Sequence, residues 1–326
     1  MSIDISPHGL KAPSLAEITA ARERVAGMAV RTPLVRLNAD GGPAEIFLKL
    51  ENLQPIGSFK LRGSGNAVLK AGREALADGI YTASAGNHAQ GVAWAARQLG
   101  VPCTVIVPDH APQTKLSAIE RLGGKIVKLP YEEWWAVIEN HGRPGIPGRF
   151  LHPVSDPDII AGNGTAGLEI LEDLPDVDTV IVPYGGGGLS CGIAAALRGM
   201  KSRAKVFAAE VDTAAPLSAS FKARAPQVVD RIQTFIDGIG AKSILPEMWG
   251  LASTLLAGSL VSSLADVIFA LRLVVERNHV VPEGAGAAAV AAALSGRTGG
   301  KKVVAVISGG NIEPAVLAKI LNGETP

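Results

Sequence analysis

The sequence has few of the residues that mark disulfide-rich or nucleic-acid-binding proteins. Its two cysteines, Cys103 and Cys191, lie in neither a CxxC pair nor a Cys/His cluster. A disulfide framework and structural zinc are therefore disfavoured, and a reducing compartment is expected. The 31 basic and 30 acidic side chains leave a net charge of +1 with no long run of one sign. This balance argues against nucleic acid and anionic membranes as partners.

The sequence also lacks a long hydrophobic run. The Ala-rich stretch of residues 285–294 is shorter than the about 20 apolar residues that a bilayer span needs. Met1 to Ser14 contain no basic region followed by an apolar core, so no signal peptide is expected. We therefore expect a cytoplasmic protein without a membrane partner.

What the chain does contain is apolar sequence in many short runs. Its 326 residues are 47% hydrophobic, and at about 100 to 200 residues per domain they suggest two domains. Short apolar runs without polar alternation are typical of parallel strands covered on both faces. Their alternation with helical patterns predicts an α/β fold with an open, doubly wound sheet. Strands are expected at residues 46–50, 80–83, 104–107, 125–129, 180–182, 206–209 and 303–307. Helices are expected at residues 91–99, 113–122, 166–171, 193–200 and 265–277, and a further helix is expected after the capping box at residues 14–17. A turn is expected at residues 31–34 and a hinge at residues 141–149.

Lys60 stands among apolar neighbours, with Gly57 before it and Gly63 after it, where a strand passes into a helix. Because a lysine ammonium is strongly hydrated, this context indicates one of two things. The side chain either lies over apolar surface, or its amine is used in chemistry. The residues around it leave both interpretations open.

Three glycine-bearing loops follow expected strands. Ser84 to His88 could bind a carboxylate at a helix start or simply cap that helix. In a helix or strand, each glycine from Gly185 to Gly188 would lower stability by about 0.5 to 1 kcal/mol relative to alanine. Four of them together therefore favour a loop whose backbone wraps a phosphate at the start of the next helix. Ser308 begins the third loop and could cap a helix or bond a ring nitrogen.

A dinucleotide site is the rival interpretation of the glycine-rich loop. Glu210 follows about twenty residues later, where a ribose-binding acid would stand. The dinucleotide fingerprint needs a third glycine, however, and Ser190 or Cys191 occupies that position. A single phosphate fits the loop better than a pyrophosphate.

Together, a reactive lysine, a phosphate loop, a carboxylate seat and a hydroxyl match the parts of pyridoxal phosphate. The same stretches resemble the signature set of the serine/threonine dehydratase (ammonia-lyase) family, which are pyridoxal phosphate enzymes with the tryptophan synthase β-subunit fold (fold type II). Further matches lie at residues 31–34, 160–165 and 282–286, so the resemblance spans about residues 30 to 320.

The resemblance implies two doubly wound parallel-sheet domains, with the smaller inserted in the larger and the cofactor in the cleft between them. The large domain would comprise residues 1–52 and 153–326, and a small mobile domain residues 53–152. The catalytic residues would be Lys60, Ser84 and Asn87, and Lys60 would form the Schiff base. The cofactor would be held by Phe59, Lys60, Asn87, Gly185, Gly186, Gly187, Gly188, Leu189, Glu283 and Ser308, with Asn87 at the ring 3-oxygen and Ser308 at the pyridine nitrogen, and the substrate carboxylate by Ser84, Ala85, Asn87 and His88.

The implied reaction converts a β-hydroxy amino acid to a 2-oxo acid and ammonia by α,β-elimination. The substrate would be L-threonine, L-serine, or a larger amino acid such as 3-phenylserine or 3-hydroxyaspartate, and the enzyme a homodimer. A racemase or β-replacement enzyme on the same cofactor is the alternative. It is disfavoured because similar racemases carry a serine where Ala85 stands. More remote alternatives are an NAD-dependent oxidoreductase and a binding module that has lost activity.

Two further features leave alternatives open. Many members of the family bind a divalent ion through an acid at the position of Glu210 and a second acid about six residues on, where this chain has Pro216. We assign no metal and keep Glu210 as a candidate ligand, leaving the need for any cation open. The aromatic cluster at residues 131–135 would pack into the small-domain core or edge the substrate pocket.

Overall fold

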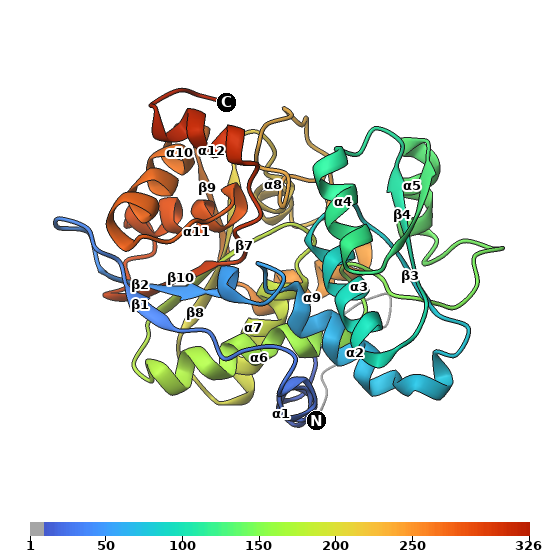
Figure 1. Cartoon of the computed structure of the whole chain (residues 1–326). Coiled ribbons are helices and arrows are strands. Elements are labelled where there is room, and N and C mark those ends of the chain that lie inside the picture. Colours follow the sequence, from blue (N-terminus) through green and yellow to red (C-terminus); the bar gives the residue numbers. More distant parts are fainter. Residues whose placement is uncertain (1–9) are drawn as a thin grey trace.

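The computed structural model describes residues 10–326, and it contains two separate β-sheets that lie side by side (Figure 1). The larger sheet has six strands in the order β1-β2-β10-β7-β8-β9, with every neighbouring pair parallel except β1 and β2. Its strands are β1 (Leu34–Arg36), β2 (Glu45–Leu50), β7 (Thr179–Pro183), β8 (Lys205–Val211), β9 (Gly258–Ser262) and β10 (Lys302–Ile307). The first nine residues of the stretch expected to lack a signal peptide lie outside the described residues.

The smaller sheet is entirely parallel, with the order β5-β4-β3-β6. Its strands are β3 (Ile80–Ala83), β4 (Cys103–Pro108), β5 (Lys125–Leu129) and β6 (Arg149–Phe150). Because all four fall between β2 and β7 in the chain, the smaller sheet is inserted in the larger one, as expected. The domain boundaries at residues 53 and 152 stay a prediction.

Helices cover both faces of each sheet. On the larger sheet, α10–α12 lie on one face and α6 and α7 on the other (Figure 1). On the smaller sheet, α3 and α5 pack against opposite faces. The helices are α1 (Leu15–Val25), α2 (Lys60–Ala75), α3 (Asn87–Leu99), α4 (Gln113–Arg121), α5 (Tyr131–Glu139), α6 (Pro157–Asp173), α7 (Gly188–Gly199), α8 (Pro216–Ala223), α9 (Pro246–Leu255), α10 (Leu264–Leu273), α11 (Gly284–Leu294) and α12 (Pro314–Leu321), with a short 3₁₀ helix η1 (Glu51–Leu53) and a π-helix η2 (Val274–Asn278).

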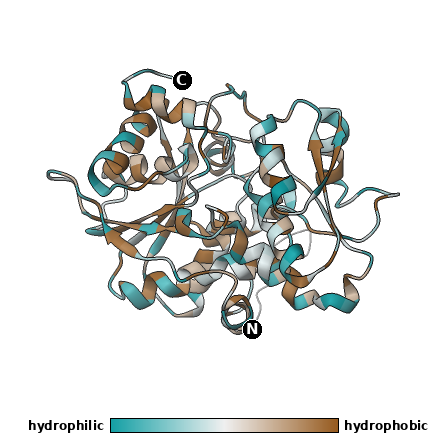
Figure 2. Ribbon diagram, viewed as in Figure 1, coloured by the Kyte–Doolittle hydropathy of each residue, from teal (hydrophilic) through white to brown (hydrophobic). Residues whose placement is uncertain are grey.

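Strand β10 shows why the sequence lacks polar alternation. Ala305 and Ile307 pack into the core beneath α10 and α11, whereas Val304 and Val306 pack into the core beneath α7. Both faces of the strand are therefore shielded from solvent, as is typical of parallel strands that lie between two layers of helices. Figure 2 shows the same division, with hydrophobic colour on the strands and hydrophilic colour on outward helix surfaces. The described part of the chain contains no helix with the length and apolarity needed to cross a membrane.

The sequence prediction missed three strands. Residues 34–36 form the antiparallel edge strand β1, which begins at the last residue of the turn expected at 31–34, and Arg149 and Phe150 form β6 at the end of the expected hinge. Strand β9 begins with a glycine and contains two serines in its five residues, so it carries no continuous apolar run. All three lie at sheet edges, where only one neighbour has to be matched. The capping box of Ser14 and Glu17 is present as predicted.

A buried ion network fixes the first turn of α2, which begins at Lys60. The Arg62 guanidinium donates two hydrogen bonds to Glu51, at 2.7 and 2.8 Å, and two to Glu169, also at 2.7 and 2.8 Å. Lys49 donates to the same Glu169 at 2.6 Å. With two positive and two negative groups, the network balances its charge, as a buried set must. It ties α2 to β2 and α6, and so to the larger sheet.

Candidate active site

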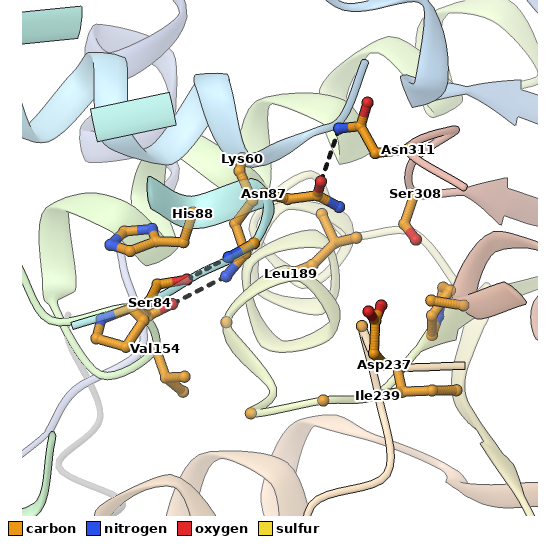
Figure 3. Close-up of a pocket in the computed structure, with 18 of the residues that line it drawn as sticks. Lys60, Ser84, Asn87, His88, Val154, Leu189, Asp237, Ile239, Ser308 and Asn311 are labelled. Carbon is orange, nitrogen blue, oxygen red and sulfur yellow. Dashed lines mark hydrogen bonds between the residues drawn. The ribbon is translucent and has the colours of Figure 1, made fainter. Parts of the chain in front are cut away.

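A cavity of about 340 Å³ opens between the two sheets, at the carboxyl ends of their strands. Figure 3 shows Lys60, Asn87, Leu189 and Ser308 arranged around it. The structure brings together every residue that the sequence analysis assigned to the cofactor and the substrate carboxylate: Phe59, Lys60, Ser84, Ala85, Asn87, His88, Gly185, Gly186, Gly187, Gly188, Leu189, Glu283 and Ser308 all line this cavity. Glu210 does not.

Lys60 reaches the cavity from the first residue of α2. Its Nζ donates a hydrogen bond to the Pro153 carbonyl at 3.0 Å and lies 5.2 Å from the centroid of the Phe59 ring. Burial lowers the pKa of Lys60 to about 8, against an opposing effect from the Glu283 carboxylate. The amine is therefore readily deprotonated, which is what a nucleophile and a general base require.

The glycine-rich loop joins β7 to α7 with unusually close packing. A Cβ added to Gly186 would lie 2.3 Å from a methyl carbon of Val154, and Gly187 has a φ of +96°. No side chain caps α7, so the amides at its start are left for a ligand on the cavity side. This loop fits a phosphate, because only glycines allow the backbone itself to form the cavity wall here.

The loop that the sequence analysis expected to bind the substrate carboxylate is built from neutral groups. No side chain caps α3, and Ser84 Oγ instead accepts from the Gly86 amide at 3.2 Å. Burial, and then the nearby Lys60 ammonium, hold the pKa of His88 well below its usual value. His88 is therefore an uncharged imidazole, and the seat depends on helix amides and hydroxyl groups. Ala85 adds only a methyl group.

Asn87 and Glu283 contact each other in the cavity wall. Asn87 Nδ2 donates to both carboxylate oxygens of Glu283, each at 3.0 Å. Burial raises the pKa of Glu283 to about 7, against the lowering effect of that hydrogen bond. Ser308 is 3% exposed, directly follows the last residue of β10 and lines the cavity. Because α12 begins only at Pro314, the Ser308 hydroxyl does not cap that helix.

The sequence analysis missed two charged residues in the cavity wall, Lys115 and Asp237, which form an ion pair with each other. Nothing in their sequence context sets them apart from surface charges. Trp134 also lines the cavity, while Trp135 of the same cluster packs against the small-domain core. Each interpretation of the aromatic cluster thus holds for different side chains of α5.

Glu210 has a structural role. It is 2% exposed, and its carboxylate accepts hydrogen bonds from the amides of Leu217 and Ser218, at 2.9 and 2.7 Å, and from the Ser259 hydroxyl at 2.6 Å. These donors start α8 and join it to β9. A divalent cation would have to compete with these three donors for the carboxylate and would find no side-chain ligand atom on Pro216, so these residues do not fit a metal site.

A separate cluster of His141, His152 and Glu247 has the residue types of a metal site. His152 Nδ1, however, accepts hydrogen bonds from the amides of Val154 and Ser155, at 3.1 and 2.9 Å. Burial lowers the pKa of His152 to about 3, so its ring is neutral and carries its proton on Nε2. A protonated nitrogen has no lone pair for a metal, and we assign no ion to this cluster.

Comparisons with known proteins agree with this geometry. The sequence profile described as "Pyridoxal-phosphate dependent enzyme" matches residues 25–309. The chain is 38% identical over 317 residues to the L-threonine ammonia-lyase of Thermotoga maritima, covering 95% of this chain and 78% of that protein. Among solved structures, threonine deaminase isoform 2 from Solanum lycopersicum matches with a TM-score of 0.85 at 29% identity, covering 94% of this chain and 86% of that one. Serine racemase from Dictyostelium discoideum matches with a TM-score of 0.81 at 31% identity, covering 93% and 99%.

These matches speak against the nicotinamide alternative, which also left Lys60 without a role. The cofactor they support fits the cavity, since Lys60, the glycine-rich loop and Ser308 all line the same space. The chain belongs to the family of pyridoxal-phosphate dependent enzymes.

Proposed function

We propose that the protein is a lyase that eliminates the β-hydroxyl of a β-hydroxy amino acid as water. The released enamine becomes an imine, which takes up a water on hydrolysis and gives a 2-oxo acid and ammonia. The observation that carries the proposal is that one cavity holds Lys60, the uncapped start of α7 and the uncapped start of α3. These are the three attachment points that an amino acid on pyridoxal phosphate requires. The named activities of the 38% identical relative and of the tomato structure support the same reaction class.

The protein would hold the cofactor through Lys60 at its aldehyde, residues 185–189 at its phosphate, and Asn87 and Ser308 at its ring. When bound, pyridoxal phosphate withdraws electrons from the Cα of an amino acid attached to it. A serine hydroxyl is neutral, so Ser308 would not stabilise a charged pyridinium as a carboxylate does. Less of the negative charge at Cα would then be delocalised into the ring, which favours elimination of the β-hydroxyl.

Lys60 would act as the general base at Cα once the substrate amine has displaced it. Its lowered pKa makes the neutral amine accessible near neutral pH. The seat at Ser84 to His88 would orient the substrate carboxylate through uncharged donors. Inversion of configuration requires a proton donor on the face of Cα opposite Lys60. Ala85, which stands where similar racemases carry a serine, cannot donate a proton there.

The decisive experiment compares elimination with racemisation. We expect 2-oxo acid formation from L-threonine or L-serine to exceed formation of the D-isomer by at least about 100-fold, the smallest factor typical of a missing acid–base group. Turnover of L-threo-3-phenylserine and 3-hydroxyaspartate beside them would define how large a β-substituent the wall at Trp134 accepts. Rapid interconversion of L- and D-serine would contradict the proposal and favour the racemase alternative.

We also expect activity without a divalent cation. Because Glu210 is occupied by the amides of α8 and by Ser259, dialysis against EDTA should change kcat and the unfolding temperature little. Assays of the dialysed enzyme with and without added Mg²⁺ or Ca²⁺ provide the check. Loss of activity that Mg²⁺ restores would show that this carboxylate rearranges to bind a metal.

The finer assignments belong to the same proposal. A cytoplasmic location is supported by two buried cysteines that remain unpaired thiols. A homodimer is supported by the exposed apolar side chains of Leu53 and Val281, which lie near each other because Asn52 donates to the Val281 carbonyl. Sedimentation of the purified protein as a monomer would overturn the dimer.

A further inference from the structure

Three side chains form a continuous hydrogen-bonded chain along one wall of the cavity. Asn311, in the loop after β10, donates from Nδ2 to Oδ1 of Asn87 at 2.7 Å (Figure 3). Asn87 in turn donates from Nδ2 to both oxygens of Glu283. The loop that carries Asn311 also contacts the loop that carries the lysine, since the Gly310 amide donates to the Gly57 carbonyl at 2.9 Å.

The direction of this chain is fixed by a backbone group. Asn311 Nδ2 also donates to the Ile56 carbonyl at 3.0 Å, and a carbonyl oxygen can only accept. The atom of Asn311 that faces Ile56 must therefore be its nitrogen, and the same nitrogen faces Asn87. A donor there requires the oxygen end of the Asn87 amide, which leaves the Asn87 nitrogen toward Glu283.

Gly57 makes room for this arrangement. It has a φ of +73°, and a Cβ on it would lie 2.7 Å from Oδ1 of Asn311. A side chain at position 57 would therefore push Asn311 out of reach of Ile56. Gly57 is therefore needed to leave space for the Asn311 side chain, a role that the sequence analysis did not identify.

We propose that Asn311 is a positioning residue that sets the orientation of the Asn87 amide. The Ile56 carbonyl orients Asn311, Asn311 orients Asn87, and Asn87 is left with its donor nitrogen on the Glu283 side of the cavity. The reverse orientation would place the Asn87 oxygen against the Glu283 carboxylate, with two acceptors facing each other. This inference rests on the proposed function, in which a donor from Asn87 meets the 3-oxygen of pyridoxal phosphate.

Two substitutions at position 311 separate orientation from mere contact. Asn311→Ala removes the donor and leaves Asn87 held by Glu283 alone. Asn311→Asp keeps the shape but replaces the donor with an acceptor, which favours the flipped Asn87 amide. The side chain is exposed, so neither variant is expected to alter folding. Asn52→Asp is the matched control, because Asn52 also donates to a backbone carbonyl nearby, that of Val281, but does not touch Asn87.

The measurements are made at pH 8, where Glu283, with a pKa of about 7, is mostly a carboxylate. Apoprotein is titrated with pyridoxal phosphate and followed by its visible absorption band, and kcat and KM are measured separately. We expect Asn311→Asp to raise the dissociation constant about tenfold or more, because an acceptor at position 311 would then face the acceptor oxygen of Asn87. Asn311→Ala should raise it by less, and Asn52→Asp should leave it within about twofold. The absorption maximum should shift only in Asn311→Asp.

Equal effects of Asn311→Ala and Asn311→Asp would overturn the orientation proposal, as would an Asn52→Asp effect as large as that of Asn311→Asp. A wild-type apoprotein that fails to bind pyridoxal phosphate would instead contradict the proposed function. The two failures are therefore distinguished by the first titration.

Discussion

Lys60→Ala protein is expected to lose the covalently held cofactor and to show kcat/KM lower by at least about 10⁴-fold, because one substitution removes both the amine that binds the aldehyde and the general base. Visible absorption after gel filtration measures the first effect, and release of 2-oxo acid measures the second. Lys115→Ala is the control, because Lys115 also lines the cavity but is paired with Asp237. Its cofactor should be retained.

The loss should be chemical and not structural. Lys60 makes a single hydrogen bond to a carbonyl, and its pKa is lowered by burial, so its charged form opposes folding below about pH 8. Between about pH 8 and the pKa of 10.5 that the lysine has in the unfolded chain, the unfolded chain binds the proton more tightly than the folded protein. The free energy of unfolding therefore rises with pH across this range. At pH 7, Lys60→Ala should therefore unfold at the same temperature as wild-type apoprotein or at a higher one.

Gly186→Ala is expected to weaken the binding of pyridoxal phosphate about 10- to 100-fold, the equivalent of a typical overpacking penalty. The new methyl carbon would lie 2.3 and 2.5 Å from the two methyl groups of Val154, so the loop would have to move. Titration of the apoprotein with the cofactor measures the effect.

Gly86→Ala is the matched control for that experiment. It also lines the cavity, but no heavy atom lies within 4 Å of the Cβ it would gain, and its φ of −114° suits any residue. Its affinity for pyridoxal phosphate should stay near that of wild type, although substrate KM can rise. If both alanine variants bind the cofactor as tightly as wild type, the loop at Gly186 does not hold the phosphate.

The core strands and the site could be predicted from the sequence because their signals are local. Strand β10 is buried on both faces, so its sequence is a continuous apolar run. Four successive glycines lower the stability of a helix or strand, so they indicate a binding loop and not part of a core. The strand-end loops then converge, since the carboxyl ends of parallel strands share one edge of a sheet.

The rest depends on contacts between segments far apart in the chain. Asp237 meets Lys115 across 122 residues, and Asn311 meets Asn87 across 224. Trp134 faces the cavity while its helix neighbours face the core, which the periodicity of a nine-residue helix does not resolve. The sequence offered Glu210 as a ribose-binding acid or a metal ligand, whereas its use as an acceptor for the first amides of α8 follows from the position of that helix.

One measurement tests the central claim most directly. The purified protein, loaded with pyridoxal phosphate, is reduced with borohydride, digested and analysed by mass spectrometry. A phosphopyridoxyl group on the peptide containing Lys60, and on no other lysine, is the predicted result. Reduction that labels another lysine, or none, would contradict the assignment of Lys60 as the residue that holds the cofactor.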